Sequence, residues 1–474
     1  MEIDPMSSAA TRTEKDSLGE KQVPADVYFG IQTLRAVENY PISGLRPHPR
    51  FIDAYMYQKK ASALANIECG ALDGAKGKAI VAACDEILAG KLRDQFVVDV
   101  FHSGAGVSQH MNVNEVLANR AAEILGGRRG EYTLVHPNDH VNFGQSTNDT
   151  YPTAMRMAAL LVLRDLDPVL LALEKSLDAK GKEFDGILKS GRTHLQDAVP
   201  IRLGQEFAAY ARAFGRCRVV LRDAGRHLEE LGIGGTAAGT GLNTAAGYRE
   251  AAIRILRDAT GLDLRPAPDM REAMQSNLPM AAVASALKMT ALEAIRITND
   301  LRLLCSGPIT GLAEIMLPAV QPGSSIMPGK VNPAILEMVA ITSFHVVGAE
   351  TAVSMAVQAG QLELNVMMPT MVFEVCFSAE ILRNALAVLR NRCIEGITAD
   401  ADRCRRYAEL SPSIATALNP YIGYAKGAEV VKEALRTGKT IPEVVREKKL
   451  MSEEDLKRVL DPMKMTEPGI TRKS

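Results

Sequence analysis

The fold class is decided by residues 201–231, which read IRLGQEFAAYARAFGRCRVVLRDAGRHLEEL. Apolar residues recur there at helical spacing and form one broad face: Leu203, Phe207, Ala208, Tyr210, Ala211, Phe214, Val219 and Leu221. Arginine and glutamate fill the positions between them, as is typical of a long amphipathic helix. A strand would instead alternate apolar and polar residues with a period of two.

The same pattern recurs along the chain, over residues 151–182, 278–306, 335–360 and 365–394. Each stretch is two to three times longer than the ~12-residue helix that is average in globular proteins. Such lengths without heptad charge pairs predict a bundle of long helices. Strand-like segments are few and short, so we expect a mainly all-α fold. We also expect Pro168 to kink or interrupt the first long helix.

Breaks in the helical pattern divide the chain. They fall at 126–148, 232–244 and 307–333, with a last change of pattern near Ser411-Pro412. We therefore expect three domains: an N-terminal mainly helical domain (1–146), a central long-helix bundle (147–402) and a small C-terminal helical domain (403–474).

Composition narrows the class of protein. The 474 residues carry a formal net charge of -1, which offers no electrostatic footprint for nucleic acid or an anionic membrane surface. The longest apolar run, near Ala158 to Leu163, is far shorter than the ~20 residues that span a bilayer. Seven dispersed cysteines without a CxxC pair, and no apolar stretch at the N-terminus, predict reduced thiols in a cytoplasmic protein.

The most informative segment for chemistry is GSSIMPGKVNP, residues 323–333. A phosphate-cradling loop needs four residues between its glycines and Ser or Thr after Lys, but five separate Gly323 from Gly329, and Val331 follows Lys330. A penicillin-binding SxxK motif fails as well, because Lys330 lies six residues after Ser324. The remaining plain alternative is a Gly/Pro turn between two helices.

This loop combines a base with groups that bind anions. Ser324 is a weak base in water, so its alkoxide would need backbone N–H groups in a closed, dry site. Lys330 and Asn332 are suitable donors to the charge that develops when a proton leaves carbon beside a carboxylate. Gly323 and Gly329 could act as hinges of a lid.

Two other breaks carry polar side chains. Ser146, Thr147 and Asn148 precede a helix expected near Tyr151 and could form an anion site with its free N–H groups. An ordinary N-cap cluster, with Asp149 or Thr150 as the cap, is an equally weighted alternative. His194, in a polar loop, is a fair proton carrier, against the alternative of a surface or satisfied core histidine. The histidines show no metal-ligand spacing, so no metal site is expected.

The 323–333 loop resembles, nearly letter for letter, the signature loop of the aspartase/fumarase superfamily, and the resemblance covers residues 13–469. Residues 14–20 and 359–367 look more like the aspartase branch, whereas residues 135–142 look fumarase-like. The resemblance implies a three-domain fold with a central helix bundle and a homotetramer whose active sites are shared between subunits. It implies no cofactor for the elimination itself, although some aspartases respond to divalent metal.

Carried over residue by residue, the resemblance makes Ser324 the general base. His194, paired with Glu337, would contact substrate and assist charge or proton movement. Asn148 would face the amino group. The other residues expected to bind the C4 dicarboxylate are Ser146, Thr147, Thr193, Ser325, Met327, Lys330, Asn332 and Val107.

Four positions depart from the family pattern. Val107 stands where relatives usually place a threonine that contacts substrate, and His110 stands where they place an asparagine. Ile309 and Met368 replace a usual arginine and a usual glutamate. We interpret the last two mainly as an exchange of an ion pair for apolar packing, with a reshaped pocket as the alternative.

The sequence therefore predicts reversible elimination of ammonia from L-aspartate to give fumarate. Fumarate hydratase, with water as the leaving group, is the first alternative, and a lyase for another substituted C4 diacid is the second. From a different class of function, an inactive structural relative remains possible. The intact Ser324, Lys330, Asn332 and His194 argue against it.

Overall fold

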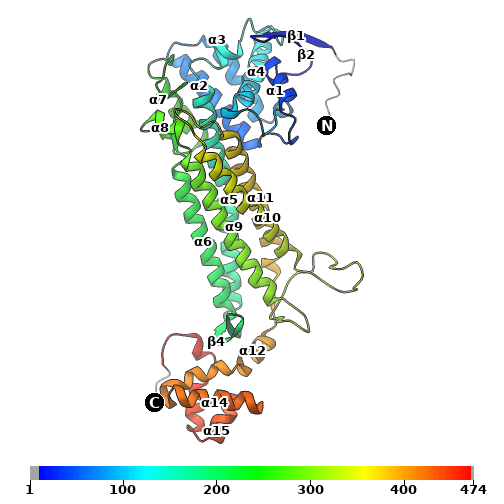
Figure 1. Cartoon of the computed structure of the whole chain (residues 1–474), viewed down its shortest axis with the longest axis vertical. Coiled ribbons are helices and arrows are strands. Elements are labelled where there is room, and N and C mark those ends of the chain that lie inside the picture. The colour runs from blue at the N-terminus through cyan, green and yellow to red at the C-terminus, as the bar shows by residue number, and fades with distance from the viewer. Residues whose placement is uncertain (1–9, 471–474) are drawn as a thin grey trace. The chain divides into compact units, whose positions relative to one another are not determined.

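The computed structural model describes residues 10–470, and within them long helices dominate, which confirms the predicted all-α fold (Figure 1). The five longest match the five apolar stretches to within a few residues: α5 (Thr147–Glu183), α6 (Leu203–Arg226), α9 (Leu278–Leu304), α10 (Ala334–Gln358) and α11 (Met368–Arg392). The N-terminal residues that bear on a secretory signal lie partly outside the described residues.

The remaining elements are shorter. The N-terminal region holds β1 (Thr11–Asp16), β2 (Gly19–Pro24), α1 (Ile31–Asn39), α2 (Pro49–Glu68), α3 (Gly74–Leu88) and α4 (Val107–Ile124). Between the long helices lie β3 (Leu188–Thr193), β4 (Gln196–Arg202), β5 (Glu230–Leu231), α7 (Tyr248–Thr260), β6 (Arg265–Pro266), α8 (Met270–Gln275) and β7 (Ile315–Met316). The C-terminal region contains β8 (Thr398–Ala399), α12 (Ala401–Leu410), α13 (Asn419–Ile422), α14 (Tyr424–Thr437), α15 (Ile441–Glu447) and α16 (Glu453–Val459).

Pro168 lies inside α5, which continues as one helix from Thr147 to Glu183. Of the predicted kink or interruption, the interruption is therefore wrong and the kink stays a prediction. A proline inside a helix removes one backbone hydrogen bond. The apolar side chains that flank Pro168, Leu166 and Leu170, are buried, and this packing holds the helix together.

The chain forms two compact units. Unit 1 comprises 1–167, 219–291 and 344–382, and unit 2 comprises 168–218, 292–343 and 383–474. Each of the five long helices contributes one segment to each unit. The three-domain division at residues 146 and 402 stays a prediction.

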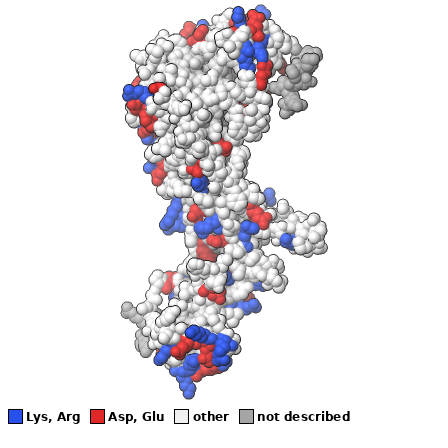
Figure 2. Space-filling view, in the orientation of Figure 1, with Lys and Arg blue, Asp and Glu red and all other residues white. Residues whose placement is uncertain are grey.

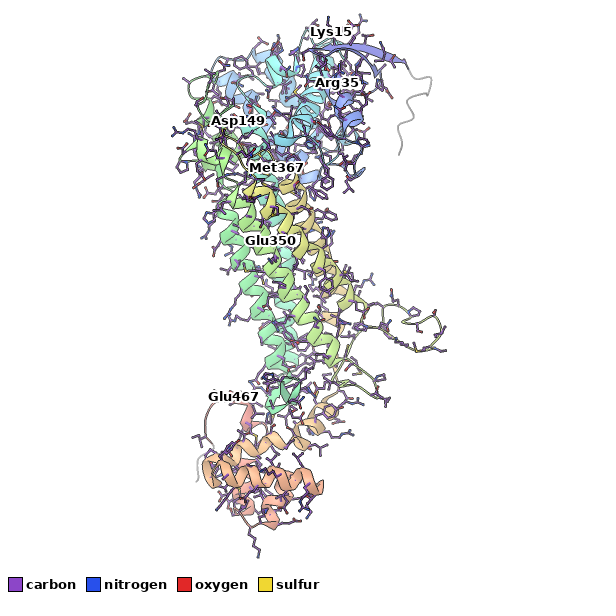
Figure 3. The ribbon with its side chains drawn as sticks, viewed as in Figure 1. Lys15, Arg35, Asp149, Glu350, Met367 and Glu467 are labelled. Atoms are coloured by element: carbon purple, nitrogen blue, oxygen red, sulfur yellow. The ribbon has the colours of Figure 1, made fainter. Side chains whose placement is uncertain are left out.

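In unit 1 the segments of α9, α10 and α11 pack through small and branched apolar side chains, including Leu287, Val346 and Val375. A charge pair fixes two of these helices, because Lys288 Nζ lies 2.9 Å from the Glu350 carboxylate, labelled in Figure 3. A buried carboxylate orders the N-terminal region. Glu115 accepts hydrogen bonds from the backbone N–H groups of Gly30, Gln32 and Thr33, and burial raises its pKa to about 7.

In unit 2, β3 and β4 form an antiparallel hairpin with Thr193 opposite Gln196. The C-terminal helices share an apolar core of their own: Ile414, Leu418, Val430, Ile441, Val444, Val445, Leu456 and Val459. On the face shown in Figure 2, positive and negative side chains are interspersed and do not separate by sign.

Among residues 10–470, two helices could cross a membrane by length and composition: α9 and α10, each with a mean hydropathy of 1.3 in its most apolar window. Core helices of bundles pass the same test, so this finding assigns no membrane. Both helices were predicted from the sequence, but uninterrupted apolar runs do not reveal their high mean hydropathy, because small and polar residues interrupt these two. Only 44% and 33% of the two windows is buried within the chain.

Candidate active site

The 323–333 loop connects α9 to α10 through a segment that leaves the helices (Figure 1). At its start the backbone N–H groups of Ile326 and Met327 both donate to Ser324 Oγ, at 3.2 and 3.0 Å. Two converging N–H dipoles stabilise negative charge on this oxygen, which is what a serine base requires. Ser325 and Met327 are exposed beside it.

A narrow neck closes the loop. The Gly323 N–H donates to the Lys330 carbonyl at 2.8 Å, and the Asn332 side-chain amide donates to the Gly323 carbonyl at 2.7 Å. A Cβ at Gly323 would lie 2.7 Å from the Asn332 nitrogen and from the Lys330 oxygen. Only glycine therefore fits at the neck. Asn332 is predicted to bind a carboxylate, but one N–H of its side-chain amide donates to the Gly323 carbonyl within the loop.

A groove of about 870 Å³ in unit 2 opens at the base of this loop. Lys330, Asn332 and Glu337 line it, together with Arg302 and Cys305. Lys330 is exposed and its ammonium has no hydrogen bond or ion pair among residues 10–470, so its charge remains available to an anion.

Thr193 and His194 lie at the tip of the β3–β4 hairpin. His194 and Leu195 both have positive φ values, 54° and 58°, a combination typical of a two-residue type I′ turn. A histidine at positive φ is uncommon, and such residues concentrate at functional sites. Both Thr193 and His194 are exposed.

Buried charges hold this hairpin in place. Glu314, fully buried, accepts from both terminal nitrogens of Arg192 at 3.0 and 2.8 Å and lies 3.2 Å from Lys189 Nζ. Lys189 also donates to Glu206 at 2.7 Å. Burial raises the pKa of Glu206, against the opposing effect of Lys189. This network could not be predicted from the sequence, because its charged side chains come together only in the folded chain and show no local spacing.

His194 and Glu337 do not form the predicted pair within the chain. Both belong to unit 2, but the Glu337 carboxylate instead lies 3.8 Å from the Arg302 guanidinium. No hydrogen bond or ion pair among residues 10–470 involves the His194 ring. The role assigned to this pair stays a prediction.

The other predicted cluster lies in unit 1, where α5 begins at Thr147 and not near Tyr151. Ser146 caps this helix, since its hydroxyl accepts from the Asn148 N–H at 3.2 Å. Asp149, one of the two expected caps, has a different task. Its buried carboxylate accepts from the N–H groups of Ser146, Gly234 and Thr236 at 2.9, 3.1 and 3.0 Å (Figure 3).

Thr147 lies on a buried polar cluster. Its Oγ1 is 2.7 Å from His110 Nδ1, and His110 Nε2 is 2.8 Å from Lys59 Nζ. Burial and the nearby Lys59 hold the pKa of His110 well below its ordinary value, and burial lowers the pKa of Lys59 to about 7. Lys59 gave no signal in the sequence, because it follows Gln58 in an ordinary helical stretch.

The four residues that depart from the family pattern lie in different surroundings. Met368 is fully buried, as the packing interpretation expects, but the Ile309 side chain is 83% exposed. Apolar packing within one chain therefore does not explain Ile309, and for this residue the packing interpretation stays a prediction. Val107 opens α4 and is 45% exposed.

Metal ligands are not grouped in the part of the chain that the structure describes. Among residues 10–470 no set of three or more His, Cys, Asp or Glu side chains is arranged to hold a metal ion. Unit 2 offers a hydrogen-bonded serine hydroxyl, an ammonium without a partner among residues 10–470 and an exposed histidine, groups that suit proton transfer on an anionic substrate. Unit 1 by itself offers a helix N-terminus rich in hydroxyls, which suits an anion.

These features define a helical lyase, and the comparison with protein families agrees. Residues 19–348 match the family described as Lyase, and residues 414–467 match the family described as Fumarase C C-terminus. The chain belongs to this lyase family.

Individual relatives refine the assignment. The chain is 46% identical over 462 residues to an aspartate ammonia-lyase of Bacillus subtilis, covering 98% of this chain and 97% of the relative. It is 48% identical to a class II fumarate hydratase of Halobacterium salinarum, covering 97% and 98%. A solved fumarate lyase (delta crystallin) of Brucella melitensis superposes with a TM-score of 0.94 at 47% identity, covering 97% of this chain and all of the other.

Proposed function

We propose that this protein is an aspartate ammonia-lyase, which converts L-aspartate to fumarate and ammonia in a reversible anti elimination. Full-length similarity to aspartate ammonia-lyases supports the reaction. The observation that carries the chemistry is the pair of backbone N–H groups directed at Ser324 Oγ.

In the first step Ser324, as alkoxide, takes a proton from Cβ of aspartate. The electron pair of that C–H bond moves into the adjacent carboxylate and gives an enediolate-like dianion. Lys330 and the hydroxyls of Ser146 and Thr147 would stabilise this charge, because a preformed set of donors needs no reorganisation as charge develops.

In the second step the electron pair returns to form the carbon–carbon double bond. The Cα–N bond breaks and ammonia leaves, with Asn148 facing the amino group. His194, exposed at the hairpin tip, would assist charge or proton movement there. Fumarate then departs and Ser324 loses its proton again.

Fumarate hydratase is the second candidate, and the similarity to the Halobacterium enzyme favours it. The two reactions share proton abstraction and differ only in the leaving group. Ultraviolet absorbance of fumarate distinguishes them when the purified protein receives L-aspartate or L-malate separately. Fumarate from aspartate alone is the expected result, whereas fumarate from malate alone would overturn the ammonia-lyase assignment. A Ser324→Ala variant should lose several orders of magnitude in rate in either case.

We further propose that the protein is a homotetramer whose active sites are shared between copies. Three observations support this. The apolar windows of α9 and α10 are less than half buried, with exposed Leu278, Ile341 and Phe344 among them. Large exposed apolar surface of this kind marks a protein interface. His194 also lacks a partner among the described residues, as does Lys330.

Mixed oligomers test the shared site. Inactive Ser324→Ala and His194→Ala chains, unfolded together and refolded, should regain part of the activity if the two residues come from different copies. A differently tagged pair of chains reports the extent of mixing by pull-down. Proven mixing without any recovery would contradict the shared site.

We propose no cofactor for the elimination, with divalent metal as a potential activator only. Seven cysteines, all without disulfide partners, are compatible with a reducing, cytoplasmic setting. Chelator treatment should leave basal turnover intact, and loss of all turnover that added Mg²⁺ restores would refute the proposal.

A further inference from the structure

The buried cluster behind Thr147 contains two side chains that the proposed reaction does not use, Lys59 and His110. Lys59 comes from α2, His110 from α4 and Thr147 from the first turn of α5, all within unit 1. Both Lys59 and His110 are almost completely buried. The hydrogen bonds around them fix where each proton lies.

Lys59 faces three acceptors. Its Nζ lies 2.8 Å from His110 Nε2, 3.0 Å from Asn142 Oδ1 and 2.9 Å from Gln145 Oε1. Three acceptors match the three protons of an ammonium. Asp149, Cys84 and His110 are the titratable groups around it, and the Asp149 carboxylate favours the charged form.

The orientation of the two amides is settled by their other contacts. The Asn142 NH₂ donates to the Gln145 carbonyl at 3.2 Å. The Gln145 NH₂ donates to the carbonyls of Val141 and Phe143 at 3.1 and 3.2 Å. Both amide oxygens are thereby left facing Lys59, which must donate to them.

The charge on Lys59 then selects the tautomer of His110. An ammonium 2.8 Å away can only donate to Nε2, so the single proton of the neutral imidazole lies on Nδ1. Thr150 does not disturb this assignment, because its hydroxyl donates to the Ser146 carbonyl at 2.8 Å. Tyr55 stacks on the imidazole with ring centroids 5.9 Å apart, which holds the ring in place.

The consequence reaches Thr147. Its Oγ1 lies 2.7 Å from His110 Nδ1 and accepts that proton, so the hydroxyl hydrogen of Thr147 is free to point away from the cluster. A hydroxyl in this state can donate to a carboxylate. With the opposite tautomer it would donate inward and present only lone pairs to an anion.

We propose that His110, oriented by Lys59, is a positioning residue that directs the Thr147 hydroxyl as a donor to one carboxylate of the C4 dicarboxylate. This inference rests on the proposed function for the role of Thr147. It also gives a physical reason for an asparagine at position 110 in relatives, since an asparagine amide likewise offers one acceptor and one donor.

Binding of succinate, a C4 dicarboxylate that cannot be eliminated, tests the inference by calorimetry at pH 6.5. Thr147→Val and His110→Leu should each weaken succinate about 10- to 100-fold, the range for one lost hydrogen bond to a charged group. The double variant should be no weaker than Thr147→Val alone, because His110 acts through that hydroxyl. His110→Asn should recover affinity to within about threefold.

Lys59→Met should behave like His110→Leu. The neighbouring Lys60, which pairs with Asp85 at 2.6 Å, supplies the matched control, so that Lys60→Met leaves succinate affinity unchanged. Additive losses in the His110→Leu/Thr147→Val double variant would overturn the inference, whereas the proposed function is tested separately by fumarate production from aspartate with the unaltered protein. If the unaltered protein does not bind succinate, both the inference and the proposed function fail.

Neutron diffraction locates the protons of His110 and Lys59 in the unaltered protein, so this test does not depend on whether a variant folds. Deuterium on His110 Nδ1 and three deuterons on Lys59 Nζ are expected. Deuterium on Nε2 would overturn the inference, whatever reaction the protein catalyses.

Discussion

Glu314 offers the sharpest test of how the hairpin that carries His194 is held. Its carboxylate is fully buried and faces two cations, Arg192 through two hydrogen bonds and Lys189 at 3.2 Å. Glu314→Gln keeps the size of the side chain but removes the negative charge. Lys189 would keep its ion pair with Glu206, and Arg192 would lose its hydrogen-bonded carboxylate.

Breaking a buried ion pair by neutralising one partner costs about 3–5 kcal/mol, because the remaining charge stays buried without compensation. A chain of 474 residues has an unfolding entropy of roughly 1 kcal/mol per kelvin, so Tm should fall by about 3–5 °C. The hairpin tip should also lose its fixed position. We therefore expect kcat to fall about tenfold or more, since misplacement by about 1 Å can cost 100-fold.

Differential scanning calorimetry and fumarate absorbance measure the two effects. Glu447→Gln is the matched control, because Glu447 pairs with Lys439 at 2.7 Å on the surface, with both side chains about half exposed. An exposed pair of this kind contributes only ~0–1 kcal/mol. If Glu314→Gln matched the control in both Tm and kcat, the buried network would not be what holds the hairpin.

Two further predictions concern the loop and the acid limit of stability. Gly323→Ala places a Cβ 2.7 Å from two backbone atoms of the loop neck. We expect kcat to fall about 100-fold while Tm, measured by calorimetry, stays within about 2 °C. An unchanged kcat would refute the idea that only glycine fits at the neck. Burial alone would raise the pKa of Asp99, but hydrogen bonds from Phe101, Ser43 and Gly44 hold it below its ordinary 3.8. Asp99 thus stabilises the fold above about pH 4, and this contribution is lost as the pH falls through the lowered pKa. Asp99→Asn should therefore lower Tm at pH 7 more than at pH 3.

The long helices could be predicted from the sequence because each buries one continuous apolar face. The stretches 278–306 and 335–360 correspond to α9 and α10 almost residue for residue. Pro168 does not interrupt α5, because the loss of one hydrogen bond is outweighed by packing along the whole helix. The start of α5 was misplaced by a few residues, because Ser146 caps the helix and the two expected caps do not.

Within the site, sequence motifs identified the loops but not the side chains behind them. Ser324, Lys330 and His194 stand in recognisable segments. Lys59 and Glu314 do not, because each acts through partners at least 50 residues away in the sequence. Charged residues that become buried in long-range contacts leave no local pattern, so only the fold could show them.

One cause accounts for the features that remain unsatisfied in a single chain. His194 has no partner among residues 10–470, Ile309 is an exposed apolar side chain, and more than half of the apolar windows of α9 and α10 is not buried. A monomer would have to leave all of these in water, at a cost of about 25 cal/mol for every Å² of apolar surface. Further copies of the chain would cover the helices and bring the hairpin of one copy to the loop of another. On this reasoning, dissociation of the oligomer should abolish turnover even where each chain keeps its helical content.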